Sequence, residues 1–359
     1  MHKNVSLIPL FLSAALCAAQ QAPAIVGAVA KVGPVAPAET KSLDRHKRAV
    51  KIADAGGGFL GTLELSGFSL KDLLEGRGVV KEDDGFNRPL DMIVTVRGKG
   101  GALAVFSFGE VFLAGDEGVL LADGARMILP THHPPLEDPE NDPTTAVLDL
   151  KSRAGIDLGG CASCHDGEAC QALYFPTGWV LTSARDGFGG RFVENPAEIA
   201  VRQVGVKVEG KRDLSREAVV ELPSIVGPDG KTHPFSAAEY KKQPRITMAD
   251  AGIGQGKGYR GISSWEGAPL KNMLRHLLPK GHDPKNTYVL VTAADGYRST
   301  FSGTEVFWSS DERCVLLVDK KNGRALGRGQ GLYMVMPRAD FFVDRSVRMV
   351  AEIRLVLVK

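Results

Sequence analysis

The chain of 359 residues has few cysteines, few aromatic residues and no excess of charge of either sign. Its 44 basic residues are balanced by 42 acidic ones, so the net charge of +2 excludes the basic surface of a nucleic-acid-binding protein. After the first twenty residues, no apolar run is long enough for a transmembrane helix, so we expect no membrane span. The length suffices for two ordinary domains, each with its own core.

The five cysteines are distributed unevenly along the chain. Cys17 lies near the start, three lie between Cys161 and Cys170, and Cys314 stands alone. Cysteines grouped beside a histidine indicate a ligand or covalent-attachment site, whereas scattered cysteines would indicate disulfides. Cys314 comes directly before an apolar run and is therefore expected to be a buried structural thiol.

The first residues are typical of a secretory signal. A weakly basic start is followed by the apolar stretch Leu7 to Leu16, and Cys17-Ala18-Ala19 offers a cleavage site made of small residues. We therefore expect a signal peptide over residues 1–19 and a periplasmic or secreted location. A tether rich in proline and alanine is expected over residues 20–48.

Two later regions match each other segment by segment and in the same order, which indicates an internal repeat. The matching segments are Ala53-Asp54-Ala55-Gly56 and Ala249-Asp250-Ala251-Gly252, Phe106-Ser107 and Phe301-Ser302, Glu110-Val111-Phe112 and Glu305-Val306-Phe307, and Arg191 and Arg345. The β-branched runs Ile93 to Arg97 and Tyr288 to Ala293 end at glycine-containing turns and are expected to be strands, and Leu70 to Leu74 and Leu270 to Leu278 have helical periodicity. Pro228-Asp229-Gly230 is expected to be the turn of the leading hairpin of the second copy. The predicted fold class is α+β, with two tandem β-rich domains over residues 49–210 and 211–359.

The two copies differ in length because the first copy contains an insertion. One of its connections is roughly forty residues longer than the equivalent connection of the second copy, which is well beyond ordinary loop lengths. We place it at about residues 124–178 of the first domain. The insertion holds most of the reactive side chains of the chain, namely His132, His133, Cys161, Cys164, His165 and Cys170. Function is expected in such a segment.

A segment of the second copy, Gly261 to Leu274, reads GISSWEGAPLKNML. This segment resembles the Trp-x-Gly-x-Pro-Leu segment of the sulfite-oxidase-type molybdopterin-binding domain. The later segments Asp295-Gly296-Tyr297, Val315-Leu316-Leu317 and Met336-Pro337 are similar to that family as well. The first copy matches more weakly, through Ser66 to Leu70. The resemblance implies two sulfite-oxidase-like domains with a mixed, β-rich fold.

Better-known members of that family hold a molybdenum cofactor through one cysteine thiolate. The resemblance implies that this cysteine would come shortly before the Trp-Gly segment, yet residues Ala249 to Gly261 contain none. The matching residues Ala53 to Gly61 contain none either. We therefore expect the scaffold without molybdopterin, since a shared fold does not bring its chemistry with it.

The segment Cys161-Ala162-Ser163-Cys164-His165 has the spacing at which one haem c is covalently attached. Two thiols can add to the two haem vinyl groups, and the adjacent imidazole of His165 can bind the iron. His132 and His133 are candidate sixth ligands because they share the insertion. The pattern predicts an exported haem c-containing electron-transfer or redox-accessory protein that works with a periplasmic redox partner.

Two other interpretations of these residues stay open. Cys161, Cys164, His165 and Cys170 could form a tetrahedral zinc site, or one of the first two cysteines could pair with Cys170 in a disulfide. Either would describe a non-enzymatic binding module. A third hypothesis is a molybdopterin-dependent oxidoreductase that relays electrons to the haem. The sequence leaves open whether the chain is an enzyme.

Overall fold

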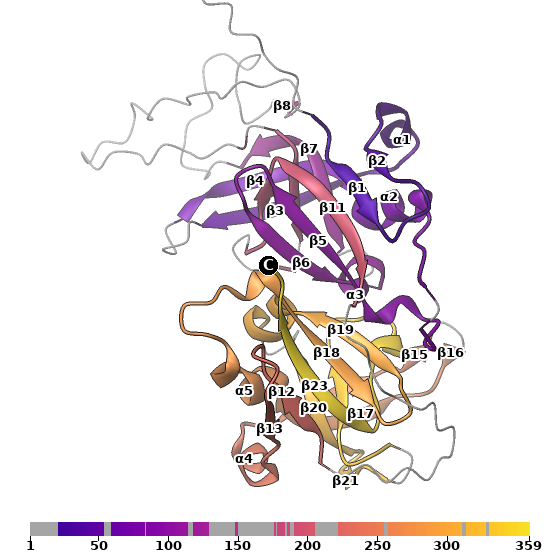
Figure 1. Ribbon diagram of the computed structural model, residues 1–359, viewed down its shortest axis with the longest axis vertical. Helices are drawn as coiled ribbons and strands as arrows, with labels where there is room; N and C mark the ends of the chain where they lie inside the picture. Colours follow the sequence, from indigo (N-terminus) through magenta and orange to yellow (C-terminus); the bar gives the residue numbers. More distant parts are fainter. Residues whose placement is uncertain are drawn as a thin grey trace, which may run out of the picture.

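The computed structural model describes residues 21–53, 59–82, 84–113, 118–128, 148–149, 176, 178–183, 185–186, 190–204, 222–254, 258–310, 314–327 and 330–359. These residues form four large β-sheets, two from each half of the sequence (Figure 1). We call residues 24–203 copy one and residues 224–357 copy two. Within the described ranges, no helix is long and apolar enough to cross a bilayer.

Copy one contains two sheets, each assembled from strands that are distant in the sequence. The first has the order β2-β1-β11-β5-β6, and the second has the order β10-β9-β7-β4-β3 with β8 against β7. Their bounds are β1 (Ala24–Gly27), β2 (Gly33–Pro34), β3 (Arg45–Ala53), β4 (Phe59–Ser69), β5 (Met92–Gly98), β6 (Leu103–Ser107), β7 (Val119–Met127), β8 (Leu148–Asp149), β9 (Val180–Ser183), β10 (Val193–Glu194) and β11 (Pro196–Gln203).

Copy two repeats this arrangement with a first sheet β13-β12-β23-β18-β19 and a second sheet β14-β17-β20-β21, in which β22 also pairs with β20. The bounds are β12 (Ser224–Val226), β13 (Thr232–Pro234), β14 (Ile246–Asp250), β15 (Ile253–Gly254), β16 (Gly258–Tyr259), β17 (Ser263–Pro269), β18 (Thr287–Ala293), β19 (Arg298–Ser302), β20 (Val315–Lys321), β21 (Arg324–Ala325), β22 (Met334–Pro337) and β23 (Val350–Leu357). Strands β15 and β16 form a separate hairpin.

The helices are short and lie at the ends of strands. They are α1 (Pro37–Lys41), α2 (Leu70–Arg77), α3 (Phe108–Phe112), α4 (Ala237–Lys242), α5 (Leu270–Leu274), the 3-10 turns η1 (Pro89–Asp91), η4 (Arg275–Leu277), η5 (Pro284–Asn286) and η7 (Val343–Arg345), and the single turn η6 (Thr304–Trp308). The predicted helices at Leu70 to Leu74 and Leu270 to Leu278 are confirmed as α2 and as α5 continued by η4.

The same pairing closes the first sheet of each copy. Strand β1 lies parallel to the last strand β11, with Ile25 opposite Ile199, and β12 lies parallel to β23, with Ile225 opposite Ile353. The other neighbours in these two sheets are antiparallel. The beginning and the end of each copy are therefore joined inside one sheet.

The predicted α+β fold class, with two tandem sulfite-oxidase-like domains, is wrong. The chain is mostly strand, and its four sheets form a propeller-like ring of four blades. The segment that carried the resemblance folds as β17 leading directly into α5. Such a strand-to-helix corner is a local structure, and it does not determine how four sheets are placed around it.

The predicted tether over residues 20–48 also needs correction, because it contains β1, β2 and α1, and Ile25 is fully buried. These elements correspond to β12, β13 and α4 of copy two. A constant offset of 200 residues relates the two stretches: Ile25-Val26-Gly27 matches Ile225-Val226-Gly227, and Pro34, Glu39 and Arg45 match Pro234, Glu239 and Arg245. The proline and alanine content obscured this match.

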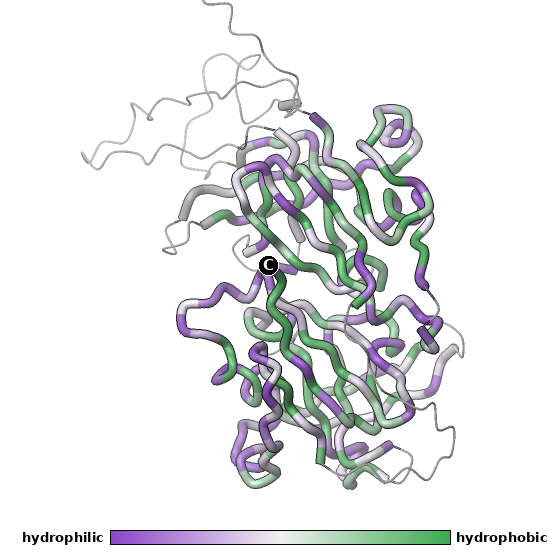
Figure 2. Tube along the Cα trace, in the orientation of Figure 1, coloured by the Kyte–Doolittle hydropathy of each residue, from purple (hydrophilic) through white to green (hydrophobic). Residues whose placement is uncertain are grey.

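The two copies meet where β5 and β6 of copy one contact β18 and β19 of copy two, and a small apolar cluster lies at this junction. Ile93 and Val105 of copy one pack with Tyr288 and Leu290 of copy two. Figure 2 shows that the strands of both copies are largely hydrophobic, whereas the connections between them are largely hydrophilic. Polar groups lie beside this cluster, and hydrogen bonds between them connect the two copies.

Candidate functional site

The predicted haem residues Cys161, Cys164 and His165, and the candidate ligands His132 and His133, lie outside the described residues. The described parts of the chain show where their segment starts and ends. Strand β7 leads into it and β9 follows it, and these two strands are antiparallel neighbours, with Ala122 opposite Val180. In copy two the equivalent strands β20 and β22 are joined by residues 322–333 alone.

Cys314 is fully buried in copy two. It belongs to an apolar cluster with Trp265, Leu316 and Met336. Among the described residues, no group of three or more His, Cys, Asp or Glu side chains could hold a metal ion. The placement of Cys314 fits the structural thiol that the sequence led us to expect.

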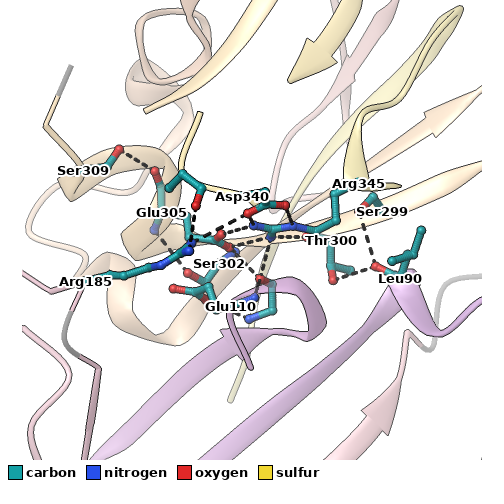
Figure 3. A network of polar contacts seen from close by, with 12 residues as sticks. Leu90, Glu110, Arg185, Ser299, Thr300, Ser302, Glu305, Ser309, Asp340 and Arg345 are labelled. Atoms are coloured by element: carbon teal, nitrogen blue, oxygen red, sulfur yellow. Dashed lines mark hydrogen bonds and ion pairs between the residues drawn. The ribbon is translucent and has the colours of Figure 1, made fainter. Parts of the chain in front are cut away.

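The most prominent polar feature of the described residues is a buried network of charges at the junction of the two copies (Figure 3). At its copy-two side, the fully buried guanidinium of Arg345 donates to Asp340 (Nε to Oδ2, 2.6 Å) and to Glu305 (Nη2 to Oε1, 2.6 Å). The same group lies over the ring of Phe301, 4.9 Å from its centroid. Bidentate geometry of this kind gives strong charge-assisted hydrogen bonds.

Copy one repeats this arrangement around Arg191. Its guanidinium donates to Asp186 (Nε to Oδ2, 2.8 Å) and to Glu110 (Nη1 to Oε2, 3.0 Å), and it lies 4.2 Å from the centroid of Phe106. In both copies the aspartate precedes the arginine by five residues, and the glutamate comes from the turn after the edge strand. Arg185 adds a third guanidinium, 3.7 Å from Asp340.

Two serines connect the copies reciprocally. Ser107 of copy one accepts a hydrogen bond from Arg345 (Nη1 to Oγ, 2.8 Å), and Ser302 of copy two accepts one from Arg191 (Nη1 to Oγ, 3.1 Å). Each serine also caps a turn, because its side chain accepts from the backbone N–H of the glutamate three residues later. A local capping motif thus places a serine where the opposite copy's arginine can reach it.

One hydrogen bond breaks this symmetry. The hydroxyl of Ser107 donates to Glu305 (Oγ to Oε2, 2.6 Å), and among the described residues no hydroxyl donates to Glu110. Burial raises the pKa of Glu110 above its ordinary value, with Arg191 opposing that effect and the nearby Glu305 adding to it. Burial also acts on Glu305, but the charge of Arg345 and the hydrogen bonds from Arg345 and Ser107 outweigh it, so its pKa is lowered.

The network therefore holds four carboxylates and three guanidinium groups out of water. Burial likewise raises the pKa of Asp340 despite its contact with Arg345. The cavity beside the network measures about 30 Å³ and is lined by Thr304 and Trp308 among others. That volume has room for one or two water molecules and excludes an organic substrate. The arrangement suits a structural role, in which buried ion pairs and hydrogen bonds hold the two copies together.

The two glutamates should differ in their effect on stability when each is replaced by glutamine. Glu305→Gln should lower the free energy of unfolding by about 3 kcal/mol or more, because it removes an ionised partner from a buried arginine. Glu110→Gln should cost less than Glu305→Gln, because burial already disfavours the ionised form of Glu110, although the amide keeps only one of the two oxygens that accept from Arg191. Denaturant unfolding at pH 7 measures both values.

The pH dependence of these variants follows from the two pKa directions. The stability contributed by Glu305 is present above its ordinary pKa of 4.5 and is lost as the pH falls through its lower folded pKa, so the deficit of Glu305→Gln should shrink at acidic pH. The raised pKa of Glu110 costs stability as the pH rises above 4.5, so Glu110→Gln should improve relative to the wild type between pH 4 and neutrality. Equal losses at every pH would contradict the asymmetry.

The internal repeat pairs Arg191 with Arg345 and the two serine-glutamate segments with each other. It does not indicate a role for any of these residues. The available signal was the match of four polar residues between the copies within one repeated segment: Ser107 and Ser302, and Glu110 and Glu305. Nothing in their spacing indicates that the arginine of one copy bonds the serine of the other. That contact depends on how the copies are placed.

Comparisons with known proteins give structural similarity but no matching family. No family model matches the chain, and none of the curated proteins matches it. Among solved structures, the chain is similar to the sulfane dehydrogenase SoxCD from Paracoccus pantotrophus, with 12% sequence identity, a TM-score of 0.32, and coverage of 79% of this chain and 78% of that chain. At so low a TM-score the similarity carries no argument about the cofactor, substrate or reaction of this chain.

Proposed function

We propose that this chain is an exported haem c-containing electron-transfer or redox-accessory protein. Cys161 and Cys164 attach the haem through two thioether bonds, and His165 is the proximal ligand of the iron. The observation that carries the proposal is the Cys-x-x-Cys-His segment itself, which supplies the two thiols and the imidazole that haem c attachment uses. When bound, the haem supplies one-electron redox chemistry.

The scaffold supports this proposal in two ways. The segment is absent from copy two, which repeats the other strands of the fold, so it is an addition rather than a part that the fold requires. It also starts and ends on the second sheet of copy one, where Trp179, Val180 and Leu181 are buried directly after it. A buried strand at this position gives the added segment a fixed base.

Few residues of the chain have a direct role in this proposal. The thiols of Cys161 and Cys164 would hold the haem covalently, and the imidazole of His165 would bind its iron. His132 and His133 remain the proposed candidates for a further ligand of the iron. The junction network holds the two copies in one arrangement and takes no part in the redox step.

A pyridine haemochrome spectrum tests the proposal. The full chain with its signal should be produced together with a haem c maturation system, purified, and tested for haem that stays on the denatured polypeptide. We expect one covalent haem per chain. A colourless protein that contains zinc and no iron would overturn the proposal in favour of the zinc site, and a metal-free protein with a disulfide would favour a binding module.

A further inference from the structure

We propose that copy one carries a binding site for a small zwitterion with an aromatic or branched apolar group, the chemistry of an apolar amino acid. The site is a cavity of about 400 Å³ at the junction with copy two. Its volume lies in the range of pockets that bind small molecules. None of its lining residues belongs to the segment proposed to hold the haem, and the two proposals are independent.

The apolar wall of the cavity is formed by a pair of stacked rings. Phe108 and Phe112 of α3 lie with their centroids 4.2 Å apart and their planes 16° from parallel. Leu90 and Leu113 complete this side of the cavity. A planar or branched apolar group would lie against these side chains and lose contact with water.

Copy two shows that this space is not a requirement of the fold. The residue equivalent to Phe108 is Gly303, and the carbonyl oxygen of Pro284 lies 2.2 Å from the point that a Cβ at Gly303 would occupy. The backbone of η5 therefore fills the position that an aromatic side chain takes in copy one. In copy one the side chain of Phe108 takes this position and lines the cavity.

Two pairs of opposite charges lie at the rim of the cavity. Lys71 Nζ is 3.9 Å from Glu75 Oε1, and Arg88 Nη1 is 3.6 Å from Asp344 Oδ1 of copy two. Both separations exceed the length of a good hydrogen bond. Lys71, Glu75 and Arg88 are 44%, 55% and 51% exposed, and ion pairs this open to water contribute little to stability.

This lining determines the class of ligand. Two cations and two carboxylates give the cavity no net charge, so neither an anion nor a cation has an overall advantage there. A zwitterion can place its carboxylate beside Lys71 or Arg88 and its ammonium beside Glu75 or Asp344, which replaces long ion pairs with shorter ones. Its side chain would then contact the stacked rings.

Isothermal titration calorimetry of the full chain with L-phenylalanine tests this proposal, with 3-phenylpropionate and 2-phenylethylamine as analogues that each lack one charge. We expect one saturable site for L-phenylalanine and at least tenfold weaker binding of both analogues. Lys71→Gln and Glu75→Gln should each weaken the binding of L-phenylalanine about tenfold, whereas Lys271→Gln, at the equivalent position of copy two, should leave it unchanged.

A cavity-filling variant gives an independent readout. Leu113→Trp introduces the residue that copy two has at the equivalent position, Trp308, and should abolish binding while the far-UV circular dichroism stays the same. Absence of saturable binding of L-phenylalanine up to 10 mM would overturn the proposal. Equal affinity for the three compounds, or an equal loss in Lys271→Gln, would overturn it as well.

Discussion

Replacing Arg345 with methionine should lower the free energy of unfolding by about 3–5 kcal/mol, the largest stability effect that we expect from one substitution in this chain. The guanidinium of Arg345 is fully buried and bonds Asp340, Glu305 and Ser107, so its removal leaves two carboxylates without their main cation. Thermal unfolding should show a midpoint lower by on the order of 10 °C.

Arg354→Met provides the matched control. Arg354 is a half-buried residue of the same copy and pairs with Glu352 at 2.8 Å on the surface of β23. Its replacement should change stability by about 0.5 kcal/mol or less. Comparable losses of stability in the two variants would show that the buried ion pairs of the junction network contribute no more to the free energy of unfolding than a surface ion pair.

A second substitution tests the contact across the junction directly. A Cβ added at Gly109 would lie 2.0 Å from Nε of Arg345, so Gly109→Ala must displace the guanidinium. In the Arg345→Met background the shorter and uncharged side chain can move away, and Gly109→Ala should cost less there than in the wild type. A double-mutant cycle measures this coupling, and additive losses would contradict it.

The second large effect concerns the proposed haem. Replacing both Cys161 and Cys164 with alanine should remove all covalently bound haem, because no thioether bond can then form. Either single replacement should leave one thioether bond and one unreacted vinyl group, which shifts the α band of the pyridine haemochrome to the red. The measurement is haem staining of the denatured chain together with that spectrum.

Cys170→Ala separates the haem proposal from the zinc alternative. A Cys-x-x-Cys-His attachment segment does not use Cys170, so this variant should keep a full complement of haem. A tetrahedral zinc site built from Cys161, Cys164, His165 and Cys170 would instead lose affinity when any one of its four ligands is removed. Loss of the chromophore in Cys170→Ala would therefore count against the proposed function.

Much of the strand and helix content followed from the sequence, and the arrangement of the sheets did not. The β-branched runs Ile93 to Arg97 and Tyr288 to Ala293 are β5 and β18, because alternation and glycine turns are local signals. The hairpin around Pro228-Asp229-Gly230 is present as β12 and β13. The sheet arrangement depends on contacts between distant segments, and the local periodicity of the sequence does not indicate such contacts.

The junction network shows the same limit at the level of single residues. The repeat already paired Glu110 with Glu305 and Arg191 with Arg345, so the residues themselves were visible. The sequence does not show that the serine of each copy bonds the arginine of the other. It therefore does not show that the pKa values of the two glutamates shift in opposite directions. The hydrogen bond from Ser107 is one of the contacts that lower the pKa of Glu305.

The parallel pairing of β1 with β11 has a consequence for the order of events during synthesis. Residues 24–27 emerge first, but their partner strand ends at Gln203, so the first sheet of copy one cannot be completed until nearly two hundred residues have followed. The segment from Cys161 to His165 leaves the ribosome before that partner strand does. In the export that we propose, Cys161 and Cys164 would meet a maturation system before β11 does, so haem attachment would precede closure of the sheet.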